Sequence, residues 1–254
     1  MRQNKKNTIA CLFAIGLGIG AGANASTLII ATEGAYPPFN YMDSKNKLHG
    51  FDVDIANALC AELGTSCTLV AQDWDGMIPA LLARRYDAIV SSMVVTEERK
   101  KKIAFTDRYY TTRLGIAVAK ESPLAGVAPD NFNTLNVGAQ SSSTQASYAE
   151  EVLGKSGANV KLYPTQDDAN MDLANGRLDA VINDKFPMLD WLSKSGESCC
   201  RWLGEANGTD DHVAIAVRQD DDALRERLNG ALARIIANGT YQKIESRYFS
   251  TSIY

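Results

Sequence analysis

The sequence predicts an α/β protein of two similar lobes, each a mainly parallel sheet flanked by helices. Short apolar, β-branched runs alternate with longer amphipathic stretches along most of the chain, as they do where a sheet carries helices on both faces. A helix–turn–strand pattern also occurs twice, over residues 82–90 and 173–182. Because no low-complexity segment separates the two copies, we expect strands rather than a flexible tether to join the lobes.

Individual elements are assigned from the period of their apolar residues and from the residues that end them. The clearest helix begins with Asp220, Asp221 and Asp222, which suit the positive end of a helix dipole, and Gly239 follows its end. The expected elements, in order, are a strand at 28–31, a helix at 52–63 closed by Gly64, a strand at 69–71, a helix at 75–84, a strand at 88–90 and a helix at 220–237.

Polar side chains follow the strand in both copies of the repeated pattern. Ser91 and Ser92 come directly after the first copy, and Asn183 and Asp184 come directly after the second. Ligands of open α/β sheets bind beyond the carboxyl ends of the strands. We therefore expect the two copies to present these polar groups to one shared cleft.

The first 25 residues have the order of a secretory signal peptide. Three basic residues precede an apolar run over residues 9–23, and the run ends in the small-residue triplet Ala23-Asn24-Ala25. A membrane anchor is the alternative, but the run is shorter than the roughly 20 residues of a spanning helix and contains four glycines. Cys11 lacks the small residues that precede a lipid-attachment site. We expect cleavage after Ala25 and a periplasmic protein.

The charge of the chain argues against nucleic acid as a partner. The sequence has 26 basic and 30 acidic residues, a net charge of −4. The expected leader holds three basic and no acidic residues, so the remainder has 23 basic against 30 acidic residues and a net charge of −7. An acidic chain with scattered lysines does not suit nucleic-acid binding. No later stretch is long and apolar enough for membrane insertion.

Four of the five cysteines lie outside the leader, and export makes disulfides possible. Cys60 ends an expected helix and Cys67 begins the next strand, with Gly64 between them, so we expect a local bridge. Cys199 and Cys200 are adjacent, and both a free buried pair and a vicinal disulfide stay open. Metal binding is disfavoured because neither of the two histidines has a cysteine at finger-like spacing.

The sequence has candidate residues that could bind a carboxylate, an ammonium and a side chain of one small ligand in the shared cleft. For the carboxylate, Arg99 follows Thr96, which can cap a short helix, and a guanidinium can bind two oxygens at once. Residues 141–145, SSSTQ, precede an amphipathic run, and hydroxyls with free amides at a helix start can bind an anion. The competing interpretations are a solvated arginine beside three lysines and serines that serve only as caps.

Asp184 is the candidate for the ammonium, because a carboxylate at a strand end can face a cleft and neutralise a buried positive charge. A solvent-exposed turn aspartate is the alternative. Glu33, Tyr36 and Trp74 are candidates for the side chain of the ligand. Two prolines, at 37–38, keep the loop that holds Glu33 and Tyr36 out of helix and central strand. Aromatic faces can stack on an aliphatic or cationic group, although core packing also explains them.

Six segments carry a resemblance to a known family: EGAYPPFN, GFDVDIANALC, DWDGMIPALLARRYDAIVSSM, TEERKKKIAFTDRYY, SSSTQASY and NGTYQKIESRYF. The chain resembles the periplasmic polar and basic amino-acid binding proteins, near those for lysine-arginine-ornithine, histidine and opines. The resemblance covers nearly the whole chain after the leader. It implies the two-lobed type II periplasmic-binding fold with a two-strand hinge, with lobe 1 at 26–112 and 209–254 and lobe 2 at 113–208.

The resemblance also implies a role for each candidate residue. The implied ligand contacts are Arg99, Ser92, Ser143 and Thr144 for the carboxylate, Asp184 and the Ser91 backbone for the ammonium, Tyr36 and Trp74 for stacking, and Glu33 and Gln140 near the far end of the side chain. A bridge between Cys60 and Cys67 is a feature of such relatives. Two positions depart from the pattern, since Val94 stands where relatives often carry serine and Ser142 where they often carry glycine.

Glu33 is the most informative residue for specificity. A desolvated carboxylate near the side-chain end favours an ammonium or guanidinium and penalises acidic ligands. We therefore expect arginine, lysine, ornithine or an arginine-derived opine, in that order. By the same resemblance the protein is expected to be a monomer without cofactor or metal that delivers its ligand to an inner-membrane ABC permease.

Two other functions compete with amino-acid binding. Cyclohexadienyl dehydratases resemble this fold, but an enzyme of that kind needs a proton donor in the cleft. The glutamate that those dehydratases carry shortly after the matching aspartate is replaced here by Pro187, so we do not expect an enzyme. A ligand-sensing receptor part is the other alternative. It would have a transmembrane helix appended, which we do not expect here, whereas a soluble sensor that works through a separate partner stays open.

Overall fold

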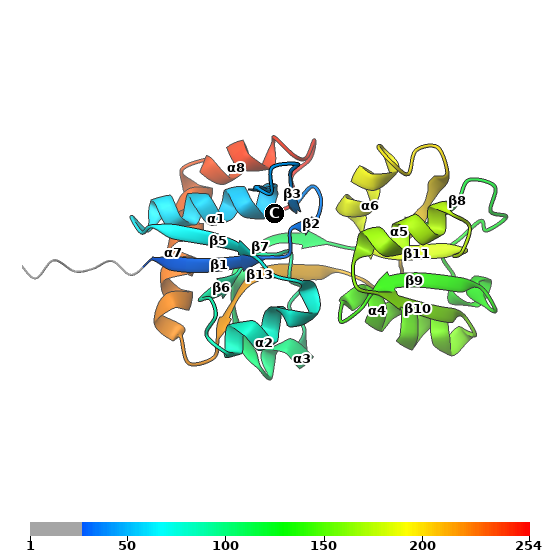
Figure 1. Cartoon of the computed structure of the whole chain (residues 1–254), viewed down its shortest axis with the longest axis horizontal. Coiled ribbons are helices and arrows are strands. Elements are labelled where there is room, and N and C mark those ends of the chain that lie inside the picture. The colour runs from blue at the N-terminus through cyan, green and yellow to red at the C-terminus, as the bar shows by residue number, and fades with distance from the viewer. Residues whose placement is uncertain (1–26) are drawn as a thin grey trace, which may run out of the picture.

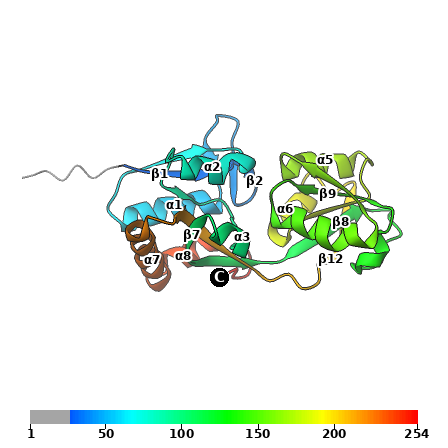
Figure 2. The same ribbon diagram turned by 90° about the horizontal axis from the view of Figure 1, so that it is seen from below.

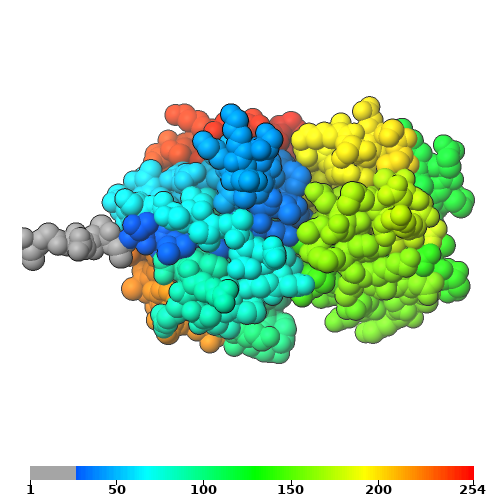
Figure 3. Space-filling view, viewed as in Figure 1, coloured from blue at the N-terminus to red at the C-terminus, as the bar shows by residue number. Residues whose placement is uncertain are grey.

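The computed structural model describes residues 27–254 and shows two lobes lying side by side, each with its own sheet (Figure 1). The expected leader and its cleavage site fall in residues 1–26, outside the described residues. Within residues 27–254, no helix combines the length and the apolar character that a bilayer-spanning segment needs. Figure 3 shows the two lobes in contact along their facing surfaces.

Lobe 1 is built on a five-stranded sheet in the order β5-β1-β6-β13-β7, with a small sheet β2-β3-β4 beside it. Helices α1, α7 and α8 pack against one another, and α2 packs against β6 and β13. The elements are β1 (Leu28–Thr32), β2 (Ala35–Tyr36), β3 (Asn40–Met42), β4 (Leu48–His49), α1 (Phe51–Glu62), β5 (Cys67–Ala71), the 3₁₀ helix η1 (Trp74–Gly76), α2 (Met77–Leu82), β6 (Ala88–Ile89), α3 (Glu97–Lys100), β7 (Ile103–Thr112), β13 (Asp211–Arg218), α7 (Asp222–Ala237) and α8 (Thr240–Glu245).

Lobe 2 is built on a second five-stranded sheet in the order β10-β9-β11-β8-β12. Helices α5 and α6 both pack against β8 and β11, while α4 contacts β9 and β11. The elements are β8 (Leu114–Ala119), η2 (Pro129–Phe132), β9 (Asn136–Gln140), α4 (Thr144–Tyr148), the π-helical turn η3 (Ala149–Leu153), η4 (Gly154–Ser156), β10 (Asn159–Tyr163), α5 (Gln166–Ala174), β11 (Ala180–Asp184), α6 (Lys185–Leu192) and β12 (Cys200–Glu205).

Each sheet contains parallel strands at one side and antiparallel strands at the other. β5, β1 and β6 are parallel, whereas β13 is antiparallel to both β6 and β7. In lobe 2, β10, β9 and β11 are parallel, and β8 is antiparallel to β11 and β12. The alternation of strand-like and helix-like segments in the sequence predicts only the parallel strands of each sheet. The exceptions, β13 and β8, are the strands that enter a lobe from the other lobe.

The direction of these linking strands places the site. Because β8 enters lobe 2 from lobe 1, it runs away from lobe 1, and the parallel strands beside it end facing lobe 1. Asp184, at the end of β11, accordingly pairs with Leu114, at the start of β8. The chain returns to lobe 1 at the start of β13, and this part of β13 pairs with the end of β7, where the chain leaves lobe 1. Asp211 accordingly lies opposite Thr112. Figure 2 shows both connections on the same side of the molecule.

The expected elements are present with shifted ends. The helix expected at 75–84 is shorter, because η1 precedes α2 and Arg84 lies beyond its end with a φ of 57°. Asp221, rather than Asp220, begins the long helix α7 as its N-cap, and its side chain accepts a hydrogen bond from the backbone N–H of Leu224.

The central strands β1 and β11 are buried on both faces of their sheets, and successive side chains of a strand point to opposite sides. In β1, Ile30 packs in a core with α1, whereas Ala31 packs in a smaller cluster beside α2. In β11, Ile182 and Val181 divide between two clusters in the same way. Each lobe therefore has its own core clusters.

Both cysteine pairs are bonded. Cys60, in α1, is joined to Cys67, the first residue of β5, with their Cα atoms 6.1 Å apart. This confirms the expected local bridge. Cys199 and Cys200 form a vicinal disulfide at the start of β12, which decides between the two states that the sequence leaves open.

Candidate functional site

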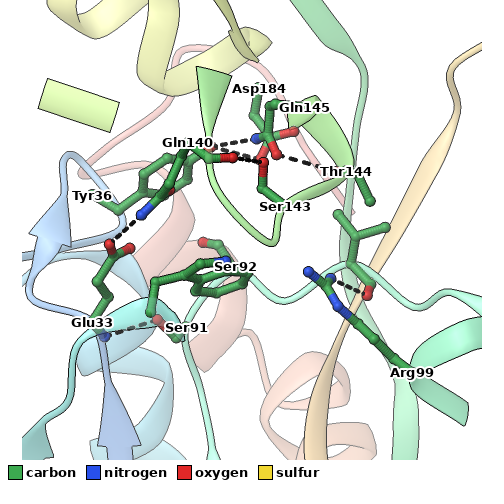
Figure 4. Close-up of a pocket in the computed structure, with 12 residues that line it drawn as sticks. Glu33, Tyr36, Ser91, Ser92, Arg99, Gln140, Ser143, Thr144, Gln145 and Asp184 are labelled. Atoms are coloured by element: carbon green, nitrogen blue, oxygen red, sulfur yellow. Dashed lines mark hydrogen bonds between the residues drawn. The ribbon is translucent and has the colours of Figure 1, made fainter. Parts of the chain in front are cut away.

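A small cavity lies between the lobes, where the parallel strands of both sheets end. Figure 4 shows that residues of both lobes face each other across it. The lining residues are Glu33, Tyr36, Trp74, Ser91, Ser92, Val94, Arg99, Gln140, Ser143, Thr144, Gln145 and Asp184. All ten residues predicted from the sequence as ligand contacts lie here together. Val94 and Gln145 complete the lining.

Arg99 supplies the positive charge of the cavity. Its helix α3 is capped by Thr96, whose hydroxyl accepts the Arg99 backbone N–H at 3.1 Å. The guanidinium donates to the carbonyl of Val94 at 2.8 Å and, across the cleft, to the carbonyl of Ser142 at 3.1 Å. It lies 5.2 Å from the ring centroid of Trp74. Burial lowers the pKa of Arg99 to about 10, so the side chain is charged at neutral pH. Its remaining N–H groups can donate to a carboxylate.

Asp184 supplies a carboxylate from the opposite lobe and is 2% exposed. Its Oδ2 accepts a hydrogen bond from the Tyr36 hydroxyl at 2.8 Å. Its Oδ1 is buried and has no hydrogen-bond partner within residues 27–254. Burial raises the pKa of Asp184 to about 7. Since an unsatisfied buried acceptor costs free energy, a cationic donor placed in the cavity would stabilise this oxygen.

Gln145 is the polar lining residue that sequence reasoning missed. Its Nε2 donates to the Tyr36 hydroxyl at 3.1 Å, and that hydroxyl also lies 2.7 Å from Oδ1 of Asn183. Gln145 belongs to the SSSTQ run, which was singled out as a possible anion site. The run itself does not say which side chain of the first helical turn points toward the other lobe, so the orientation of Gln145 had no separate signal.

Ser143 caps a helix, as the cap interpretation of the serine run expects, and it also lines the cavity. This residue is the N-cap of α4, and its hydroxyl accepts the backbone N–H of Ala146 at 3.0 Å. The same hydroxyl donates to the carbonyl of Gln140 at 2.6 Å. These bonds fix the turn that brings Ser143 and Thr144 to the cavity wall.

The end of the cavity near Glu33 is acidic. Glu33 follows β1, and its backbone N–H donates to the Ser91 hydroxyl at 2.9 Å. Gln140, from lobe 2, donates to Oε1 of Glu33 at 2.6 Å and to the carbonyl of Pro164 at 3.2 Å. Burial raises the pKa of Glu33 to about 7, and the nearby negative charge of Asp167 contributes to this rise. This end of the cavity therefore favours a cation over an anion.

Ser92 is held in place by Asp52, a buried carboxylate that the sequence analysis did not single out. Ser92 has a φ of 52°, in the left-handed region, and its hydroxyl donates to Oδ2 of Asp52 at 2.9 Å. The same Oδ2 accepts from Asn40 at 2.8 Å, and Oδ1 accepts from the Tyr109 hydroxyl at 2.6 Å. Burial raises the pKa of Asp52 to about 6. Asp52, supported by Asn40 and Tyr109, thus fixes the loop after β6.

Pro187, the position that bears on the dehydratase alternative, lies in α6 and lines a separate groove beside the cavity. Within residues 27–254, no three side chains of the histidine, cysteine, aspartate or glutamate type are grouped so that they could hold a metal ion. The chemistry of the cavity is that of a guanidinium, two carboxylates, hydroxyls, carboxamides and aromatic rings.

Residues 28–251 match the family model for bacterial extracellular solute-binding proteins, family 3. The chain is 40% identical over 230 residues to an L-arginine-binding protein of Pseudomonas aeruginosa, covering 89% of this chain and 88% of that protein. It is 34% identical over 264 residues to the lysine/arginine/ornithine-binding periplasmic protein of Escherichia coli, covering 98% and 99%.

The fold agrees with these matches. A solved structure of an ancestral arginine-binding protein bound to arginine has a TM-score of 0.83 and 33% identity, over 88% of this chain and 98% of that one. The two-lobed architecture expected from the sequence is therefore confirmed as the type II periplasmic-binding fold. The chain belongs to the bacterial extracellular solute-binding proteins of family 3.

Proposed function

We propose that this protein captures a basic α-amino acid between its lobes outside the cytoplasm and delivers it to an ABC importer. Arginine is the first candidate ligand, followed by lysine, ornithine and an arginine-derived opine. One observation carries the proposal: Arg99 from lobe 1 and Asp184 from lobe 2 line the same cavity, and Oδ1 of Asp184 is buried without a hydrogen-bond partner within residues 27–254. A guanidinium and a carboxylate on opposite walls match the two charged groups of a zwitterion.

The ligand is proposed to lie with its carboxylate at Arg99 and its ammonium at Asp184. Arg99 can bind both carboxylate oxygens, which gives a stronger interaction than one neutral hydrogen bond. Ser92, Ser143 and Thr144 line the same cavity and are proposed to help hold the carboxylate. The backbone of Ser91 completes the proposed ammonium site.

The basic preference is proposed to come from the acidic end of the cavity. A ligand guanidinium or ammonium near Glu33 would take over the donor role that Gln140 plays in this structure. Tyr36 and Trp74 provide aromatic faces on which the aliphatic or cationic part of the side chain can stack. An acidic ligand would place a second negative charge near Glu33, which is unfavourable in a buried site.

The lobes are proposed to open and close about the two connections, with boundaries at 112/113 and 208/209. Contacts of one ligand to both lobes favour the closed form, because a ligand shifts the equilibrium by its difference in affinity for the two forms. We further propose that residues 1–25 are removed on export, that the protein acts in the periplasm as a monomer, and that binding requires no cofactor.

Binding without turnover is part of the proposal. The relatives named above are binding proteins, and Pro187 cannot donate a proton where dehydratases carry a glutamate. Incubating the purified protein with prephenate and with arogenate should leave both substrates unchanged. Formation of phenylpyruvate or phenylalanine would support the dehydratase alternative instead.

A thermal-shift screen of the common amino acids tests the proposed ligand class. A ligand at about 100 times its Kd stabilises the folded state by about 2.7 kcal/mol. We expect the largest rise in melting temperature with arginine and smaller rises with lysine and ornithine. The Arg99→Ala variant is the control, and it should show no rise at the same concentrations. A largest rise with glutamate or leucine would contradict the proposal.

A further inference from the structure

Contacts next to the cavity also join the two lobes, and some of these contacts are made by residues that do not line the cavity. The Ser141 hydroxyl, in lobe 2, lies 3.0 Å and 2.9 Å from the two carboxylate oxygens of Asp75, in lobe 1. Next to this contact, Nε1 of Trp74 donates to the carbonyl of Ser142 at 3.3 Å. We call Trp74, Asp75, Ser141 and Ser142 the latch.

The backbone of Ser142 is arranged to receive donors from lobe 1. Its φ of 55° lies in the left-handed region, which is unfavourable for a residue other than glycine. In this conformation its carbonyl accepts from both Trp74 and Arg99. A strained backbone persists where the surrounding contacts hold it. Here the bonds of Ser143 within lobe 2 fix the turn, and the donors from lobe 1 add to them.

Two members of the latch form their contact outside the cavity. Asp75 and Ser141 are absent from the cavity lining, whereas Trp74 and Arg99 belong to it. The bond between Asp75 and Ser141 can therefore form without touching a ligand in the cavity. It exists only while the lobes are closed, because each lobe supplies one partner.

We propose that the bond between Ser141 and Asp75 sets how long a ligand is retained, without determining which ligand is bound. The proposal rests on the proposed amino-acid function. A contact made only in the closed form adds to the free energy that opening must overcome. Because these two residues do not touch the cavity, this contribution is the same for every ligand. Ser141 and Asp75 are thus positioning residues for closure.

The size of the effect follows from the type of bond. Hydrogen bonds to a charged acceptor contribute more than neutral ones, whereas exposed contacts are weakened by water. The Asp75–Ser141 contact is exposed, so we expect its loss to speed ligand dissociation by about three- to tenfold. Arginine and lysine should be affected by the same factor.

Stopped-flow displacement of bound arginine and of bound lysine tests the proposal in the full chain. Ser141→Ala should raise both dissociation rates by the same factor, and Ser141→Thr, which keeps the hydroxyl, should stay near the wild-type rates. Ser193→Ala is the matched control, because the Ser193 hydroxyl bonds within lobe 2, to the carbonyl of Asp190 at 2.8 Å. Its rates should equal those of the wild type.

A double-mutant cycle separates the bond from other effects of Asp75. In an Asp75→Ala background, Ser141→Ala should cause no further change in either dissociation rate, because its partner is already absent. Any of three results would overturn the proposal: unchanged dissociation rates in Ser141→Ala alone, additive effects of the two substitutions in the cycle, or a change in rate for one ligand only. If the wild type binds neither arginine nor lysine, the proposed function fails instead, and the two failures are thereby distinguished.

Discussion

Arg99→Ala is the perturbation with the largest expected effect on binding. The change removes the guanidinium that is proposed to pair with the ligand carboxylate, and it leaves the carbonyls of Val94 and Ser142 without this donor. Removing one partner of a buried charge pair costs about 3–5 kcal/mol. Since about 1.4 kcal/mol is a factor of ten in affinity, the Kd for arginine should rise by about two to three and a half orders of magnitude.

Part of this loss comes from closure, because Arg99 also bonds Ser142 across the cleft. Arg99→Lys separates the two effects. It keeps the positive charge but loses the planar pair of donors, so its Kd should lie between those of the wild type and of Arg99→Ala.

Titration calorimetry with arginine measures these differences. Arg201→Ala is the matched control, since Arg201 also donates to backbone carbonyls, those of Ser122 at 2.9 Å and Leu124 at 2.6 Å, but does not line the cavity. Its Kd should equal that of the wild type. A folded Arg99→Ala variant whose Kd stays within tenfold of the wild-type value would refute the assignment of the carboxylate site.

Three further predictions concern specificity, pH and stability. Glu33→Gln should weaken arginine binding by about 1.5–3 kcal/mol, the size of a hydrogen bond to a charged group. It should also reduce the preference for arginine over glutamine. Competitive calorimetry measures both effects, and an unchanged preference would contradict the role of Glu33. Burial raises the pKa of Glu33 and of Asp184 to about 7, so arginine affinity should fall as the pH drops from 8 to 5 and these carboxylates lose their charge. The free energy of unfolding of the ligand-free protein should instead rise as the pH falls from 8 to 5. The reason is that the folded-state pKa values lie above the unfolded ones, so the folded form binds more protons than the unfolded form in this range. Asp52 adds to this trend. Urea unfolding over the same pH range measures it, and a parallel loss of affinity and stability would contradict the assignment. Replacing both Cys60 and Cys67 with serine should lower the free energy of unfolding by about 2.5 kcal/mol, as expected for a loop of this length, with no change in the arginine Kd, because the bridge lies at the start of β5, far from the end that faces the cleft. An altered Kd would show that the bridge affects the site.

The position of the site could be predicted from the sequence because it follows from topology. Ser91 follows a strand and Asp184 ends one, and the two strands belong to matching helix–turn–strand patterns. The ends of parallel strands in open α/β sheets lie at one edge. The structure brings these ends together across the two lobes. The family resemblance added Gln140, whose place at the end of β9 had no local signature of its own.

The contacts between the lobes could not be predicted in this way. Asp75 and Ser141 are ordinary polar residues in the sequence, and their bond depends on how the two lobes are oriented when closed. Asp52 was equally hidden, because an aspartate in the first turn of a helix is usual and only the fold buries it beneath Ser92. Interactions of this kind join residues far apart along the chain, so no sequence period reports them.

Local geometry explains the other differences. The alternation of apolar runs predicts parallel strands but does not show that β8 and β13 enter from the opposite lobe, which reverses their direction. The adjacent pair Cys199 and Cys200 can be reduced or bonded with the same sequence around it, and the structure has the bonded form.

A crystal structure of the protein with bound L-arginine tests the central claim most directly. The account predicts that the ligand occupies the cavity between the lobes, with its carboxylate within hydrogen-bond distance of the Arg99 guanidinium and its ammonium at Oδ1 of Asp184. Arginine bound elsewhere, or bound in the cavity with its carboxylate away from Arg99, would contradict it.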